Sequence, residues 1–253
     1  MYVVQRLKKS DGRLVDAIYE SLKSAYDPDI SRFFVHQDAG YKKFFDSILD
    51  HPSYATYYSY DSISEELNGF ACFQILGESV FLKHIVVDNR LRGSKIGTKL
   101  LHFSLGDIRK ETRKRLNLLQ LHVFEKNSKA LSWYLSIGMQ IVGCSYWYDL
   151  YPTLEPFFSN VNNITPISKF SKDNFGFVQV NYNGLFVGTL LAKKALIVKN
   201  LELLDQLDII ASIVRQNNIE SVGFISDIDR ESFELVDKSL LMSVKISDLE
   251  FIV

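Results

Sequence analysis

Hydrophobic residues in the first part of the chain repeat with two different periods. Apolar side chains recur at helical spacing in residues 12–25 and again in 38–50, which predicts two amphipathic helices. Alternating or continuously apolar runs predict strands, and these fall at residues 2–8, 55–60, 70–76 and 79–87. The last of these strands ends in nearly unbroken apolar residues, as strands covered on both faces do. One strand, two helices and a three-stranded meander together indicate an α+β sheet protein.

A second alternation of helices and strands follows the meander. Residues 88–97 form a polar loop that contains glycine, and an apolar stripe after it predicts a helix. The expected elements are a helix at 98–114, a strand at 116–124, a helix at 127–137 closed by Gly138, and a strand at 139–148. The composition shifts at residue 149, so we expect one domain over residues 1–150 and a second over 151–253.

The last hundred or so positions have a pattern of their own. Residues 149–176 hold prolines and asparagines without a sustained period, which predicts an irregular connection. Asn183-Gly184 between two apolar runs predicts a two-residue hairpin. Further strands are expected at 195–198, 221–225 and 241–246, and helices at 201–215 and 230–239. This smaller α+β domain is either a degenerate, partial copy of the first domain that binds no cofactor, or an unrelated one.

Composition and charge narrow the classes of function. The 253 residues include 29 Lys plus Arg and 30 Asp plus Glu, so the net charge is −1. Proteins that bind nucleic acid generally are more basic, and we expect no nucleic-acid partner. The sequence has neither an apolar run long enough to span a membrane nor the apolar core of a signal peptide. We expect a cytoplasmic protein without a membrane partner, in which Cys72 and Cys144 are buried thiols.

The loop after the strand that ends at Val87 has the chemistry of an anion site. The first N–H groups of a helix have no partner within it, and the helix dipole is positive there. The segment from Arg92 to Thr98 contains glycine, which lets the backbone approach a ligand closely, and Arg92 adds a permanent positive charge. The alternative is an ordinary strand–helix turn that happens to contain glycines.

A second segment, from Asn127 to Met139, has a spacing that fits a ligand. Ala130 and Tyr134 lie four residues apart and share one helix face. A small residue at 130 makes room for a ligand or a packed strand, and the Tyr134 hydroxyl can point beyond it. The alternatives are that Asn127 is a plain helix N-cap and that Tyr134 is a core tyrosine.

Taken together, the two segments resemble the GNAT superfamily of acyl-CoA N-acyltransferases over about residues 1–150. That family's cofactor loop has the form Arg/Gln-x-x-Gly-x-Gly/Ala. The chain supplies Arg92 and Gly97 to this pattern, with Lys95 at the position of the middle glycine. The family's second pattern, Asn-x-x-Ala-x-x-x-Tyr-x-x-x-Gly-Phe, is matched from Asn127 through Gly138, with Met139 in place of phenylalanine.

The resemblance implies a three-layer, GNAT-like α+β fold with a mixed, mostly antiparallel central sheet flanked by helices. Two central parallel strands would splay apart to hold the pantetheine arm of acetyl-CoA, namely the strand ending at Val87 and the strand starting near Leu118. Asn127 would lie beside that arm, a backbone N–H near Val87 would stabilise the oxyanion, and Tyr134 would supply a proton or a hydrogen bond to the leaving thiolate. The pyrophosphate would bind the backbone of Arg92, Gly93, Ser94, Lys95, Ile96, Gly97 and Thr98.

The implied activity is transfer of an acetyl group to a primary amine by direct attack in a ternary complex without a metal. The acceptor expected first is a small molecule, such as an amino sugar or a polyamine, and a protein lysine or N-terminal amine comes second. The residue that takes the proton from the acceptor amine stays open, with two histidines as candidates. Strand alternation would place His84 on the face of Leu82, where it is structural if that face packs on helices. His122 would alternate away from its apolar neighbours. His36, Asp38 and Tyr41 are either acceptor-side residues or part of a solvated loop. The competing function is a non-catalytic acyl-CoA-binding or regulatory module, and a homodimer is also left open.

Overall fold

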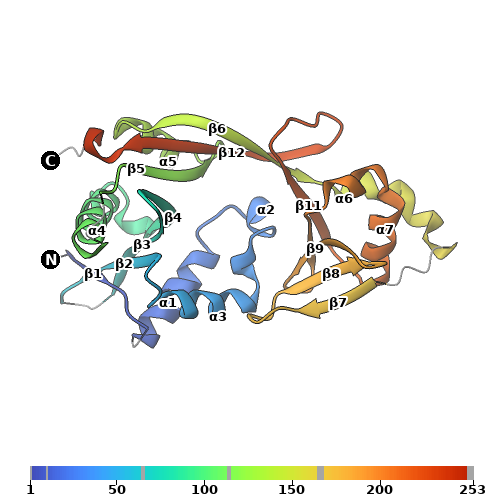
Figure 1. The fold of residues 1–253 in the computed structure, drawn as a ribbon, viewed down its shortest axis with the longest axis horizontal. Helices are drawn as coiled ribbons and strands as arrows, with labels where there is room; N and C mark the ends of the chain where they lie inside the picture. Colours follow the sequence, from blue (N-terminus) through green and yellow to red (C-terminus); the bar gives the residue numbers. More distant parts are fainter. Residues whose placement is uncertain (1, 10, 64–65, 113–114, 164–167, 250–253) are drawn as a thin grey trace. The chain divides into compact units, whose positions relative to one another are not determined.

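The computed structural model describes residues 2–9, 11–63, 66–112, 115–163 and 168–249 (Figure 1). By its internal contacts the chain forms two compact units, each drawn from separate stretches of sequence. The first unit takes in Met1–Ala25, Phe45–Cys144 and Leu240–Val253, and the second takes in Tyr26–Phe44 and Ser145–Ser239. The division of the sequence into domains 1–150 and 151–253 stays a prediction.

The first unit is built on a mixed sheet with the strand order β1-β2-β3-β4-β5-β12-β6. Its strands are β1 (Tyr2–Arg6), β2 (Tyr54–Asp61), β3 (Leu67–Leu76), β4 (Ser79–Val87), β5 (Leu118–Phe124), the beginning of β6 (Gln140–Asp149) and the end of β12 (Glu234–Lys245). Its helices are α1 (Gly12–Lys23), the end of α3 (Ala39–Ile48), α4 (Ile96–Thr112) and α5 (Ser128–Ser136). The predicted helices and strands of this part are confirmed, although positions 113 and 114 of the expected 98–114 helix lie outside the described residues.

One hydrophobic core joins α4 and α5 to the sheet of the first unit. Leu100, Leu101 and Ile108 of α4 pack in it with alternate residues of β4 and β5, among them Leu82 and Leu121. Full burial of such a side chain stabilises the fold by about 1.5–3 kcal/mol. Helix α1 packs instead against β3, whose Phe70 and Cys72 are buried outside this core. The sheet is thus covered on both faces at β3, whereas the last residues of β4, for which cover on both faces was expected, are only half-buried.

Strand β4 contains a bulge that changes which side chains face the core. The ladder with β3 skips Lys83 and resumes at His84. Leu82 faces the core before the bulge, whereas Ile85 and Val87 face it afterwards. His84 therefore lies on the opposite face from Leu82. The expected alternation was wrong because a bulge shifts the period of two by one residue.

The C-terminal strand completes the first unit. β12 is hydrogen-bonded between β5 and β6, and its Leu240, Met242 and Val244 belong to the core. The expected helix at 230–239 was wrong, because β12 already begins at Glu234. Positions 237 and 239 of this strand are also buried, but they hold aspartate and serine, so a hydrophobicity pattern does not mark this part of the chain as a strand.

The second unit has the strand order β6-β11-β10-β9-β8-β7, with a core of its own. After β6 its elements are α6 (Tyr151–Leu154), β7 (Ser168–Lys172), β8 (Val178–Tyr182), β9 (Leu185–Leu191), β10 (Ala195–Val198), α7 (Leu207–Gln216) and β11 (Ser221–Ser226). Regular elements thus occupy much of the segment expected to be irregular, of which 164–167 lie outside the described residues. The expected helix at 201–215 is divided: a 3-10 turn covers Leu201–Asp205, and α7 follows it.

The same close contact between two paired strands occurs once in each unit. Gly69 of β3 pairs with Val87, the last residue of β4, and Gly188 of β9 pairs with Val198, the last residue of β10. A Cβ on either glycine would collide with a backbone carbonyl of the partner strand, so the close approach requires glycine.

The hydrogen bond that follows this close contact is also repeated. The Asp88 N–H donates to the Asn68 carbonyl, and the Lys199 N–H donates to the Val187 carbonyl, both at 2.9 Å. In each case the residue after the paired valine bonds the residue before the paired glycine. Two such matching details favour the interpretation of the second unit as a partial copy of the first.

Candidate functional site

The loop between β4 and α4 has an unusual backbone. A 3-10 turn (Asn89–Leu91) follows β4, and then Gly93 has φ +82° and Lys95 has φ +63°. Left-handed residues in a short loop turn successive N–H groups toward a common point, which is how backbone nests bind anions. Lys95 adopts the conformation that a glycine would take at this position, at a cost of roughly 1–2 kcal/mol for an L-residue.

Backbone donors accumulate at this end of α4. The Lys99 N–H donates to the Lys95 carbonyl at 3.0 Å, which is the first bond of the helical ladder. Among residues 92–99, all of which the structure describes, the backbone donors with no acceptor are the N–H groups of Gly93, Lys95, Ile96, Gly97 and Thr98. Unbonded amides at the positive end of a helix dipole are well placed to receive a multiply charged phosphate group.

Two arginines near this loop are in different situations. The Arg90 guanidinium donates two hydrogen bonds to the Asp88 carboxylate, at 3.1 Å from Nε to Oδ1 and at 2.8 Å from an Nη to Oδ2. Hydrogen bonds from Arg90 hold the pKa of the Asp88 carboxyl at about 2. Arg92, in contrast, is exposed and forms no ion pair among the described residues. Arg92 is therefore the arginine available to an anion at the loop.

The predicted cofactor loop meets the second sequence motif. A Cβ on Gly97 would lie 3.7 Å from Val87 Cγ2 and 3.7 Å from the Trp133 ring. The Trp133 ring in turn contacts the ring of Tyr134, with centroids 4.9 Å apart. The end of β4, the start of α4 and the middle of α5 thus converge at one place. Sequence reasoning missed Trp133, although an aromatic residue one position before the motif tyrosine was a signal for it.

Asn127 and Tyr134 both have structural contacts. Asn127 caps α5, because its side-chain oxygen accepts from the Ala130 N–H at 3.3 Å. Tyr134 is 6% exposed and belongs to the core of the first unit. Each residue therefore has the ordinary role that the sequence left open as an alternative. Their roles toward a cofactor stay predictions.

The parallel strands β4 and β5 pair along only part of their length. The ladder runs from Ser79 opposite Leu118 to Leu82 opposite Leu121. Beyond this point β4 continues to Val87 still bonded to β3, while β5 continues to Phe124. The two strands that the resemblance implied would splay are therefore not bonded to each other in their second halves.

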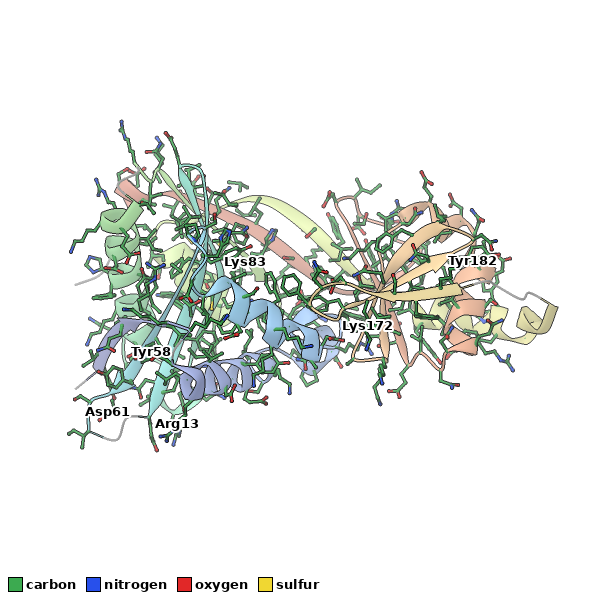
Figure 2. All side chains as sticks on the ribbon, turned by 60° about the horizontal axis from the view of Figure 1, so that its bottom comes forward. Arg13, Tyr58, Asp61, Lys83, Lys172 and Tyr182 are labelled. Atoms are coloured by element: carbon green, nitrogen blue, oxygen red, sulfur yellow. The ribbon has the colours of Figure 1, made fainter. Side chains whose placement is uncertain are left out.

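Two basic side chains, those of Lys83 and His122, lie where this ladder ends, on the face of the sheet away from the core. Leu121 and Val123 belong to the core and His122 is exposed, so His122 alternates away as expected. The rings of Phe81 and His122 have centroids 5.6 Å apart, and Lys83 Nζ lies 5.6 Å from the Phe81 ring. Figure 2 labels Lys83. Both side chains have exposed surface, yet desolvation by the surrounding protein lowers the pKa of Lys83, and desolvation followed by the charge of Lys83 lowers the pKa of His122.

His36, Asp38 and Tyr41 do not form a solvated loop. They are 2%, 9% and 6% exposed in the second unit, so this alternative was wrong. The Asp38 carboxylate accepts from the N–H groups of Gly40 and Ala192, each at 2.7 Å. Burial among aromatic rings lowers the pKa of His36 to about 4. An acceptor-side role for these residues stays a prediction.

Two further properties concern ions and membranes. Among the described residues, no group of three or more His, Cys, Asp and Glu side chains is arranged to hold a metal ion. No α-helix in that part of the chain combines the length and the hydrophobicity needed to cross a bilayer. Cys72 and Cys144 are both free thiols, and Cys144 is half-buried rather than buried.

Comparison with known proteins gives a consistent result. Residues 15–139 match the model of the acetyltransferase (GNAT) family. A solved tandem GNAT protein from the clavulanic acid biosynthesis pathway is 11% identical, with a TM-score of 0.66 over 97% of this chain and 98% of that one. A GCN5-related N-acetyltransferase from Sphaerobacter thermophilus is 12% identical, with a TM-score of 0.59 over 97% and 96%. No curated protein matches the chain. These likenesses confirm the expected fold, and the tandem protein fits the presence of a second domain.

Proposed function

Residues 15–139 belong to the acetyltransferase (GNAT) family, and on this premise we propose that the chain transfers an acetyl group from acetyl-CoA to a primary amine of a small molecule. The family uses acetyl-CoA as its donor. The observation that supports the proposal best is the set of unbonded N–H groups of Gly93, Lys95, Ile96, Gly97 and Thr98 at the start of α4. They form a cradle of the kind that a diphosphate fits.

Different residues of the loop would bind different parts of the cofactor. The amides of Gly93, Lys95, Ile96, Gly97 and Thr98 would bind the diphosphate, with Arg92 neutralising part of its charge. Lys95 does not obstruct this arrangement, because it already has the left-handed backbone of a glycine. Ser94 is partly engaged, since its N–H donates to the Leu91 carbonyl at 3.3 Å. Val87 would line the path of the pantetheine arm from the end of β4, and the Asn127 carboxamide would lie next to it.

Acetyl transfer makes three demands on the protein. The first demand is a neutral amine, which would attack the thioester of the bound donor so that a carbon–nitrogen bond replaces the carbon–sulfur bond. A backbone N–H near Val87 would stabilise the charge that develops on the carbonyl oxygen. Tyr134 would donate a hydrogen bond to the departing sulfur. Since a phenol is ordinarily a weaker acid than a thiol, that bond strengthens as negative charge builds on sulfur.

The assay that tests this function measures CoA thiol released from acetyl-CoA by the full chain. Spermidine and glucosamine represent small amines, and a peptide with a free amino terminus represents a protein acceptor. The proposal expects amine-dependent release that is fastest with a small amine. Tight binding of acetyl-CoA with no release from any amine would support the non-catalytic alternative, and faster release with the peptide would contradict the small-molecule assignment.

A further inference from the structure

The divergence of β4 and β5 brings a second set of chemical groups together on the sheet face opposite Val87 and Trp133. We propose that His122 of β5 is the base that removes the proton from the acceptor amine, with Lys83 of β4 tuning it. The inference rests on the proposed function, because it concerns the same acetyl transfer.

The positions of the two residues along their strands support this role. His122 is the first residue of β5 beyond its ladder with β4, and Lys83 is the first residue of β4 beyond it. Lys83 is also the residue that the β3 ladder skips, so neither neighbouring strand fixes it by pairing. Both side chains contact the Phe81 ring, at 5.6 Å in each case. They therefore flank the point where the strands cease to be bonded to each other.

The face on which His122 lies matters for the reaction. Val87 and Trp133 pack with the core on one side of the sheet, whereas His122 alternates to the other side. Where two strands are not hydrogen-bonded to each other, a thin chain can pass between them. An acceptor that approaches from the side of His122 would then meet the reacting carbonyl without competing with the cofactor for space.

The charges around His122 favour a neutral imidazole. The titratable side chains on its face of the flanking strands are Lys83 and His84 of β4 and, by alternation, Asp237 and Lys245 of β12. Among these, Lys83 is the charge that affects the pKa of His122. The ring keeps an exposed edge, yet surrounding protein desolvates it, and this burial together with Lys83 lowers the pKa of His122 below 6.5. Neutral imidazole has a lone pair for a proton at pH 7. The positive charge of Lys83 also disfavours the protonated form of an amine, which cannot attack.

The proton balance of the step is complete with this assignment. The amine nitrogen bonds the carbonyl carbon, and the electron pair of the carbon–sulfur bond leaves with sulfur. One N–H proton passes to a ring nitrogen of His122 and from there to solvent, and the thiolate, which accepts a hydrogen bond from Tyr134, takes up a proton from water to give CoA. The products are the N-acetylated amine and the thiol, with no oxidation or reduction.

The placement of His122 is tested without any acceptor. Diethyl pyrocarbonate labels accessible neutral histidines, and mass spectrometry measures the rate at each one in the full chain. Saturating acetyl-CoA, with binding verified by calorimetry, is expected to slow labelling of His122 several-fold. Labelling of His102, which is exposed on α4, is expected to stay the same. Unchanged labelling of His122 with acetyl-CoA bound would overturn the inference, whereas absence of binding would remove the proposed function and this inference with it.

The chemical role is tested by titration and by variants. The imidazole of His122, followed by NMR, is expected to titrate below pH 6.5 in the wild type and at higher pH in Lys83→Met, because a neighbouring cation is lost. His122→Gln is expected to lower kcat by about 100-fold with the fastest amine, to leave the KM for acetyl-CoA unchanged, and to remove the acidic limb of the pH profile. His122 protonated at pH 7, or a His122→Gln profile identical to that of the wild type, would contradict the assignment.

Discussion

Val87 and Trp133 meet at Gly97: each places a side-chain atom 3.7 Å from the position of a Cβ on that glycine. This contact brings the end of β4, the first turn of α4 and the middle of α5 into one place. The distance is ordinary for van der Waals contact, so an alanine fits here, as the Gly/Ala pattern of the family implies. Gly97 is therefore not fixed by packing.

Lys95 provides a test of whether backbone or ammonium holds the cofactor. Lys95→Gly removes the strain of a left-handed residue and is expected to raise the free energy of unfolding by about 1 kcal/mol or less, with CoA affinity retained. Lys99→Gly, in the exposed first turn of α4, is the matched control and is expected to destabilise by about 0.5–1 kcal/mol. Urea unfolding and calorimetry measure the two effects. A large loss of CoA affinity in Lys95→Gly would show that the ammonium, rather than the backbone, binds the phosphate.

Arg92 is expected to contribute charge to diphosphate binding. Arg92→Ala is predicted to weaken CoA about tenfold, equivalent to ~1.4 kcal/mol, because a charge-assisted contact is lost. Arg90→Ala is the control, since the Arg90 guanidinium is already held by Asp88. The affinity difference between wild type and Arg92→Ala should shrink at high salt, where the attraction is screened. Equal losses in the two variants would contradict a specific role for Arg92.

The hydroxyl of Tyr134 is predicted to act in the chemical step rather than in binding. Tyr134→Phe should lower kcat by about 100-fold while CoA affinity stays within about twofold of wild type. Tyr57→Phe is the control in the same core: its hydroxyl donates to Asp107 at 2.9 Å, so its loss should affect stability and not turnover. Steady-state kinetics and calorimetry separate these effects. Full turnover in Tyr134→Phe would remove the residue from the mechanism.

The C-terminal strand is predicted to be essential for the first unit. Met242 is fully buried in that core, and Met242→Ala should reduce the free energy of unfolding by about 2–5 kcal/mol. Leu235, on the same strand but 40% exposed, is the control and should change stability by less than about 0.5 kcal/mol when replaced by alanine. Urea denaturation measures both. Similar small effects would mean that β12 is dispensable to the sheet.

Features set by local chemistry could be predicted from the sequence. The Asn183-Gly184 hairpin is confirmed, because both residues have positive φ, at +48° and +84°, as a tight two-residue turn requires. The β4-to-α4 loop was also predictable, since glycines and a helix start are local signals. The unbonded amides of Ile96, Gly97 and Thr98 follow from helix geometry, whereas those of Gly93 and Lys95 lie in the loop before α4.

Features that depend on distant neighbours were missed. The bulge at Lys83 exists only in the pairing with β3, and no residue of β4 marks it. Strand β12 was assigned partly to a helix, because its buried Asp237 and Ser239 look exposed to a pattern based on hydrophobicity. The ring of His36 contacts Phe34, which in turn contacts Trp147, a residue that only folding brings there.

Calorimetric titration of CoA into the folded full chain tests most directly whether the amides from Gly93 to Thr98 bind a diphosphate. The account predicts a saturable heat of binding that weakens in Arg92→Ala and persists in Lys95→Gly. No heat of binding from protein shown to be folded by circular dichroism would contradict it.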